Sequence, residues 1–124
     1  MSQETHRIKF TLRPEDIVQI ECEPNTIMTL ELGKYSTLKI GELIHGNPKP
    51  LLCDLTNVVK MNQDCRRYFA GKEHAEVFTK CALIVTSPIS KIIGNFFLGA
   101  NKPIKPTRLF TNVAQGLTWL KDSR

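Results

Sequence analysis

Apolar and polar residues alternate in two stretches near the start of the chain. The first stretch covers residues 8–12 and the second covers residues 17–22, with Pro14-Glu15-Asp16 between them. A period of two is typical of a strand that buries one face, and Pro and Asp favour a turn. This part of the sequence therefore predicts a β-hairpin.

Further along, apolar residues form unbroken runs instead of alternating. Such runs cover residues 50–55 and 81–85. Strands that are covered by helices on both faces have this pattern, because neither face needs polar side chains. We therefore expect two buried parallel strands here, and a short last strand over residues 107–110.

Apolar residues at helical spacing fill the intervals between these strands. They predict helices over residues 29–45, 62–78, 87–100 and 112–120, with a break in the second at Gly71. The third helix has the clearest pattern, because Ser87-Pro88 is a favoured helix start and apolar residues then recur at intervals of three and four. Those apolar residues are Ile89, Ile92, Ile93, Phe96, Phe97 and Ala100.

Strands that alternate with helices imply right-handed crossovers and a largely parallel sheet. We therefore expect an α/β fold whose mixed, mostly parallel sheet has four or five strands, with an N-terminal β-hairpin and four helices. Residues 51–55, 83–85 and 109–110 should occupy neighbouring parallel strands. At 124 residues, the chain is long enough to form one domain over residues 1–124 around its own core.

The composition is that of an ordinary globular protein, with 41% hydrophobic and 23% charged residues. No apolar stretch approaches the roughly 18 residues of a membrane span, and residues 1–6 contain no apolar segment of a secretory signal. We therefore expect a cytoplasmic protein. The net charge of +5 is spread along the chain. Because no basic face with interleaved aromatic residues is apparent, nucleic-acid binding is not favoured.

The sequence carries no catalytic signature. It has no glycine-rich phosphate loop and no Gly-x-Ser-x-Gly nucleophile motif. Its four cysteines are scattered singly, and its three histidines, His6, His45 and His74, show no metal-ligand spacing. We therefore expect no enzymatic activity, no metal and no cofactor.

Two residues near the predicted strand and helix ends allow two interpretations each. Asp54 either accepts a ligand hydroxyl or a metal, or it accepts backbone N–H groups from residues 57–61, which is the commoner role. Cys65 falls in the first turn of the second predicted helix, where the helix dipole can lower the pKa of a thiol. A reduced, structural Cys65 is favoured over a reactive one.

The loops after the two buried strands predict a binding surface. Neighbouring parallel strands deliver both loops to the same carboxyl edge of a sheet, where backbone N–H groups of two helix starts are free. If the chain binds a protein partner, we expect the contact at residues 57–66 and 87–90, with charges of opposite sign at Asp64 and Arg66. The side chains assigned to this surface are Asn57, Asn62, Gln63, Asp64, Arg66 and Ser87.

A second surface is predicted around Leu98. By helical phase, Phe96, Phe97 or both enter the core, whereas Leu98 lies off that face. An apolar patch at this place is a candidate ligand groove or homodimer contact.

Several segments from residue 51 onward resemble a known family. They are Asp54-Leu55 after its buried strand, Arg67-Tyr68-Phe69, the run from Ala82 to Pro88, Ile93-Gly94-Asn95-Phe96-Phe97, and Leu109-Phe110 with Leu117-Thr118-Trp119-Leu120. Together they resemble the SpoIIAA-like branch of STAS domains, the anti-sigma-factor antagonist family, which includes a bacterial set with no assigned function. The resemblance implies the same α/β fold as the pattern of strands and helices.

The resemblance also implies a function. In that family a serine at a helix start is phosphorylated to switch partner binding, but Gln63 and Asp64 stand where the two serines would be. The resemblance therefore implies a non-enzymatic regulatory or scaffolding module that binds a protein partner without this switch. Because the branch is similar in fold to Sec14-type lipid-binding domains, the alternative is a carrier or sensor of a small apolar or anionic ligand.

Overall fold

The computed structural model describes residues 4–122, so Met1 to Gln3 of the N-terminal stretch considered above lie outside the described residues. Its central element is a five-stranded sheet. The strands are β1 (Ile8–Leu12), β2 (Val18–Cys22), β4 (Lys49–Asp54), β6 (Phe78–Ile84) and β7 (Thr107–Phe110).

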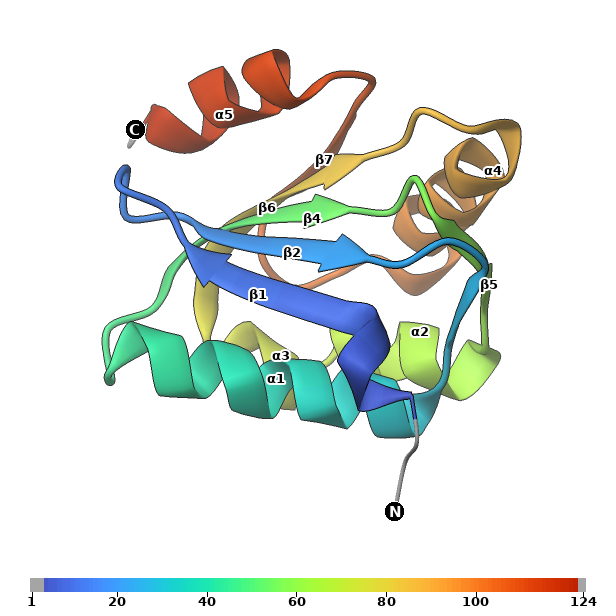
Figure 1. Ribbon diagram of the computed structural model, residues 1–124, viewed down its shortest axis with the longest axis horizontal. Coiled ribbons are helices and arrows are strands. Elements are labelled where there is room, and N and C mark those ends of the chain that lie inside the picture. The colour runs from blue at the N-terminus through green and yellow to red at the C-terminus, as the bar shows by residue number, and fades with distance from the viewer. Residues whose placement is uncertain (1–3, 123–124) are drawn as a thin grey trace.

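The order of strands across the sheet is β1-β2-β4-β6-β7 (Figure 1). β1 and β2 form an antiparallel hairpin, and the neighbours from β2 to β7 run parallel. Leu83 of β6 pairs with Cys53 of β4 on one side and with Leu109 of β7 on the other. The expected mixed, mostly parallel sheet with its N-terminal hairpin and three neighbouring parallel strands is therefore confirmed.

Helices cover both faces of this sheet, as Figure 1 shows. α1 (Leu30–Ile44), α2 (Gln63–Ala70) and α3 (Lys72–Ala75) lie on one face, and α5 (Val113–Lys121) lies on the other. α4 (Pro88–Phe96) lies near the end of the sheet toward which the parallel strands point. The second of the four expected helices divides at Gly71 into α2 and α3 and stops at Ala75, and a short 3₁₀ helix, Thr5–Arg7, precedes β1.

The sheet is buried on both faces, which explains the unbroken apolar runs. Leu51 and Leu83 belong to the larger hydrophobic cluster, which includes residues of α1 and α2. Leu52 and Ile84 point to the opposite face and belong to a smaller cluster with Leu120 of α5. Because successive side chains of a strand point to opposite faces, each run supplies both layers of the core.

The prediction of a loop over residues 57–61 is wrong. Val58–Met61 form strand β5, which pairs in parallel with β3 (Thr26–Met28) as a separate two-stranded sheet. Val58 and Met61 are buried while the two residues between them face solvent. The sequence pattern near β5 does not reveal this strand. Its partner β3 is only three residues long, and α1 and β4 separate the two strands in the sequence.

The helix expected over residues 87–100 forms and Phe97 enters the core as expected, but most of the apolar stripe stays outside the core. Ser90, Gly94 and Phe97 are buried. Small residues let the helix approach the sheet closely, since a Cβ atom on Gly94 would lie 2.8 Å from Cδ2 of Leu109. The large apolar side chains of α4 that face solvent are Ile89, Ile92 and Phe96, with exposed fractions of 48%, 69% and 52%. We name these three residues the α4 patch.

The prediction of an exposed patch around Leu98 is also wrong. Leu98 is half-buried and packs against the larger cluster. From Phe97 to Asn101 the chain continues as a π-helix, η2. Because a π-helix has more residues per turn than an α-helix, the angular phase that places Leu98 off the inner face does not hold there. The exposed apolar side chains of this region are those of the α4 patch.

Candidate partner-binding surface

The loops that follow β4 and β6 are joined to each other. Thr56 and Thr86 share a hydrogen bond between their Oγ1 atoms at 2.7 Å. Ser87 Oγ donates to the carbonyl oxygen of Thr56 at 3.1 Å. The carboxyl edge of the sheet is thus a connected structure in which the start of α4 rests on the loop after β4.

Asp54 is engaged within its own loop. Its Oδ1 accepts a hydrogen bond from the N–H of Thr56 at 2.9 Å. An aspartate that bonds the backbone two residues further on stabilises a turn. The structural interpretation of Asp54 is therefore the one observed, although the donor comes before the expected residues 57–61.

Ser87 caps α4 through a reciprocal pair of hydrogen bonds. Its Oγ accepts from the N–H of Ser90 at 3.1 Å, and Ser90 Oγ accepts from the N–H of Ser87 at 3.0 Å. This capping box satisfies donors that would otherwise lack a partner at the helix start. Since Ser87 Oγ also donates to Thr56, its role in the structure is to hold α4 on the neighbouring loop.

Asn57 is exposed and connects the two sheets. Its Nδ2 donates to the carbonyl oxygen of Cys22 at 3.0 Å, and its own carbonyl accepts from the N–H of Thr26 at 3.1 Å. The side chain therefore bonds the end of β2, while the backbone bonds the start of β3.

The start of α2 is held without a capping side chain at its N-cap position. Asn62 stands there and is of a residue type that often caps a helix, but its side chain makes no cap hydrogen bond. Its N–H donates to the carbonyl oxygen of Met28 at 2.9 Å, so the small sheet fixes its backbone. Asp64 Oδ1 accepts the N–H of Cys65 at 2.8 Å. Gln63 and Asp64 are the exposed side chains of this helix start.

Arg66 links α2 to the two elements beside it. Its Nη1 donates to the carbonyl oxygen of Met61, at the end of β5, at 2.7 Å. Its Cζ lies 4.6 Å from the ring centroid of Phe96 on α4, a distance at which a guanidinium is attracted to an aromatic face. Within residues 4–122, its buried Nε has no hydrogen-bond partner. Arg66 is half-buried at this junction, so only part of its side chain is open to solvent.

Exposed apolar side chains lie around these polar residues. The α4 patch is on a helix that packs against β5. The small sheet adds Val59 and Ile27, which are 37% and 48% exposed. The apolar stripe in the sequence includes Ile89, Ile92 and Phe96, and of Phe96 and Phe97 it is Phe97 that enters the core. The signal that identifies the inner face is the pair of small residues Ser90 and Gly94, four apart. A surface with exposed apolar and charged side chains is able to bind another macromolecule.

The thiols are unreactive at neutral pH. Burial raises the pKa of Cys65 to about 12, with a further contribution from the nearby Asp64 carboxylate. The helix dipole therefore does not activate this thiol, and the structural interpretation holds. Burial also raises the pKa of Cys22 and Cys81 to about 12, and that of Cys53 well above its ordinary value.

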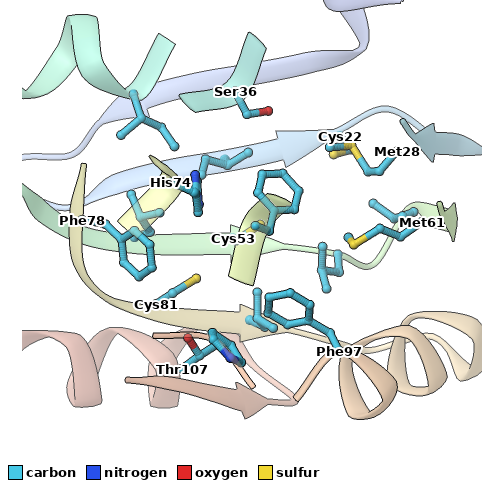
Figure 2. Close-up of a pocket in the computed structure, with 18 of the residues that line it drawn as sticks. Cys22, Met28, Ser36, Cys53, Met61, His74, Phe78, Cys81, Phe97 and Thr107 are labelled. Atoms are coloured by element: carbon cyan, nitrogen blue, oxygen red, sulfur yellow. The ribbon is translucent and has the colours of Figure 1, made fainter. Parts of the chain in front are cut away.

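Three of these cysteines line a small apolar cavity between the main sheet and the helices below it. Figure 2 shows Cys22, Cys53 and Cys81 around this space together with Met28 and Met61. Its volume is about 60 Å³.

His74 also lines the cavity, and Thr37 Oγ1 lies 2.8 Å from its Nδ1. Burial lowers the pKa of His74 to about 4, so the ring is neutral at pH 7.

Among residues 4–122, no three His, Cys, Asp or Glu side chains are placed to hold a metal ion. Each helix in this range is too short or too polar to cross a bilayer.

Several solved structures are similar to this one. An uncharacterized protein from the DUF3478 family of Shewanella loihica PV-4, with a SpoIIAA-like fold, is 17% identical with a TM-score of 0.59, and 91% of each chain is covered. The anti-sigma factor antagonist SpoIIAA in its unphosphorylated form is 13% identical with a TM-score of 0.61, covering 93% of this chain and 98% of that one. An anti-sigma factor antagonist from Mycobacterium paratuberculosis is 15% identical with a TM-score of 0.57, covering 98% of this chain and 100% of that one.

At these identities, the likeness shows the fold, which is the STAS fold of SpoIIAA type that the sequence segments suggested. No curated protein matches the chain. A family model described as "Domain of unknown function (DUF7793)" matches residues 10–124, and the chain therefore belongs to that family.

Proposed function

We propose that this chain is a non-enzymatic regulatory or scaffolding module that binds a protein partner at the carboxyl edge of its main sheet. The observation that carries the proposal is the α4 patch, because three large apolar side chains stay in water beside an exposed charged helix start. Contiguous apolar surface of this kind marks interaction sites on soluble proteins. The anti-sigma factor antagonists of similar fold support a regulatory role. A module of this type, with residues 1–124 as one domain, is expected in the bacterial cytoplasm.

The polar residues of the surface have two different roles in this proposal. Asn57, Asn62 and Ser87 hold the loops and the helix starts in place through hydrogen bonds made within the chain. Gln63 and Asp64 are exposed and face the partner directly. Arg66 holds the Phe96 ring beside them. Apolar contacts then supply affinity, and the Asp64 charge supplies selectivity.

The module works without a phosphoserine switch. Gln63 and Asp64 carry no hydroxyl group, and the nearest serine or threonine along the chain, Thr56, is bonded to Thr86 at 2.7 Å. Asp64 gives the helix start a permanent negative charge where the family's serine acquires one on phosphorylation. Phosphate mapped to residues 56–66 after incubation with a serine/threonine kinase from the same cell would contradict this part of the proposal.

Partner capture with matched surface variants tests the proposal. Ile92→Glu introduces a charge into the α4 patch, and Leu38→Glu introduces the same charge at an equally exposed apolar site on α1, where Leu38 is 60% exposed. We expect a protein captured from cell extract by the parent chain and by Leu38→Glu to be lost with Ile92→Glu. Titration of the purified partner should show affinity at least about tenfold weaker for Ile92→Glu. Equal affinity of the two variants would reject this surface.

A small apolar ligand in the cavity is the second candidate function, because apolar side chains form most of the cavity wall. The cavity volume of about 60 Å³ counts against it, since this is less than half of the ~150 Å³ at which an apolar protein cavity binds benzene. A lipid therefore does not fit unless the helices move. An anionic ligand is disfavoured as well, because no lysine or arginine among residues 4–122 lines the cavity and His74 on its wall is neutral. Native mass spectrometry that finds a co-purified apolar molecule in the folded protein would place this function first.

A further inference from the structure

The main sheet ends at β7, and the outer side of this strand is open. Within residues 4–122, no strand lies beyond it. The carbonyl oxygens of Pro106 and Phe110 accept hydrogen bonds from N–H groups on the β6 side, both at 2.9 Å. Because alternate residues of a parallel strand bond to the same neighbour, Thr107 and Leu109 direct their N–H and C=O groups away from the sheet. This edge offers main-chain donors and acceptors to another strand.

A groove follows this edge between α4 and α5. It has a volume of about 930 Å³ and shares no lining residue with the small cavity under the sheet. Residues of α4, α5 and β7 line it. Figure 1 shows where these three elements lie. The polar and aromatic lining of the groove includes Lys91, Asn95, Arg108, Gln115, Thr118 and Trp119. A groove lined by a free strand edge has the shape required by an extended peptide, which gains main-chain hydrogen bonds by joining the sheet.

The charges that line the groove are mainly positive. Lys91 and Arg108 are exposed, and neither forms an ion pair with any residue in the described part of the chain. The Cζ atom of Arg108 lies 5.3 Å from the ring of Phe110 and 5.7 Å from that of Trp119, so the aromatic rings hold the guanidinium in the groove. Asp122 is the acidic residue of the lining. The groove therefore complements a peptide that carries carboxylates.

We propose that the groove between α4 and α5 binds an acidic peptide in extended conformation, which adds to β7 as a further strand of the main sheet. The N–H and C=O groups of Thr107 and Leu109 bond its main chain. Its side chains alternate between the two walls, so that acidic side chains reach Lys91 and Arg108.

A peptide fits this groove better than a single-stranded nucleic acid does. Base stacking requires a free aromatic face. Trp119 packs against Phe110 at 5.7 Å between ring centroids, and the Nζ atom of Lys80 lies 4.6 Å from its centroid. A nucleic acid would also leave the strand edge without main-chain partners.

The peptide site is separate from the surface proposed above at the starts of α2 and α4. β7 and α5, which form most of the groove, contribute nothing to that surface. Failure of one proposal leaves the other unaffected, because their tests use different ligands and different variants.

The first arm of the experiment uses the full chain and two synthetic peptides. The first is a capped peptide of about eight residues that alternates Val and Glu, the length of an ordinary strand. The second has the same sequence with N-methyl groups on alternate residues, which keep the charge but remove main-chain donors. Emission of Trp119, the one tryptophan of the chain, and the amide NMR signal of Leu109 report binding. We expect saturable binding of the first peptide, slower hydrogen exchange at Leu109, and affinity at least about tenfold weaker for the methylated peptide.

Charge reversal gives the second arm. The variant Lys91→Glu/Arg108→Glu should bind the Val/Glu peptide at least about tenfold more weakly and should bind a Val/Lys peptide instead. The control Lys9→Glu/Lys34→Glu makes the same charge change at exposed residues of β1 and α1 and should bind like the parent. Equal binding of the methylated peptide, loss of binding in the control alone, or no binding of any peptide would overturn the proposal. A Trp119 response to oligothymidylate in the absence of a peptide response would overturn it in favour of nucleic acid.

Discussion

At the scale of single residues, some side chains of the candidate surface hold its loops in place, whereas others are exposed and open to contact with a partner. Asn57 and Ser87 are polar and lie near the surface, but their hydrogen bonds join loops of the same chain. Arg66 contacts both the carbonyl oxygen of Met61 and the ring of Phe96. Gln63 and Asp64 are exposed. The sequence shows that these residue types are favoured at helix starts, but not whether a side chain bonds to its own chain or stays exposed. That role depends on which residues the fold places next to the side chain.

Asp64 is the residue whose charge should matter most to a partner. We expect Asp64→Lys to weaken partner binding by more than about 1 kcal/mol, because it reverses a charge in the proposed interface. The loss in unfolding free energy should be smaller, about 0.3–1 kcal/mol, since the change affects an exposed helix-dipole interaction and one hydrogen bond to Cys65. Calorimetric titration with the partner and urea denaturation measure the two quantities.

Glu31→Lys is the matched control for this measurement. Glu31 is exposed in the first turn of α1 and is not among the residues assigned to the candidate surface, so its reversal makes the same change to a helix dipole without altering those residues. It should cost similar stability and leave partner binding unchanged. A partner that binds Asp64→Lys as tightly as the parent chain would show that the site is assigned to the wrong surface.

At the scale of elements, α4 shows how a helix can have a clear apolar stripe and yet pack through another face. Its buried residues Ser90 and Gly94 are small, and they allow the backbone to come close to Leu109 and Val85. The stripe that remains exposed is then available to a partner, and this is the feature on which the proposed function rests.

Alanine substitution at two glycines tests this packing. A Cβ atom at Gly94 would lie 2.8 Å from Leu109 Cδ2 and 3.1 Å from Val85 Cγ1, so Gly94→Ala should destabilise the fold by about 1–3 kcal/mol. At Gly99, five residues further on, a Cβ atom would meet no other heavy atom within 4 Å. Gly99→Ala should therefore leave stability unchanged or raise it slightly, because alanine restricts the unfolded chain. Similar denaturation midpoints for the two variants would contradict the close approach of α4.

At the scale of the whole molecule, His74 lies at a junction between layers of the fold. Its ring centroid is 4.8 Å from that of Phe69 on α2 and 5.1 Å from that of Phe78 on β6. Thr37 of α1 lies within hydrogen-bond distance of its Nδ1 atom. A charge on this ring would be placed in the apolar space between the sheet and three helices, so its protonation affects the stability of the whole domain.

The pH dependence of unfolding follows from this position. The folded-state pKa of His74 is lowered to about 4 by burial, while an unfolded histidine titrates near 6.5. Below pH 6.5 the unfolded state therefore binds a proton that the folded state does not, and stability falls until about pH 4. Between pH 7 and pH 5 this site should remove about 2 kcal/mol. Urea denaturation at pH 7 and pH 5 measures the unfolding free energy of the parent and of His74→Gln. The loss of unfolding free energy at pH 5 should be larger for the parent, and an equal loss in the two proteins would contradict the role of His74.

The order of elements could be predicted because it rests on local chemistry. Unbroken apolar runs identify β4 and β6, alternation identifies the hairpin of β1 and β2, and Ser87-Pro88 identifies the start of α4. Each of these signals lies within a few residues of the element that it determines. Parallel packing of the strands then follows from their alternation with helices, so the location of the candidate surface at the carboxyl edge could be predicted as well.

By itself, the sequence determined the α/β fold, the neighbouring strands and the edge at which their loops meet. Only the tertiary structure decided which face of α4 is buried, that β5 pairs with β3, that the Asn62 side chain caps nothing, and that β7 has an open edge in a groove. The physical reason is the range of the interactions involved. Helix and strand preferences depend on neighbours in the chain, whereas packing faces, strand partners and grooves depend on residues that only the folded chain brings together.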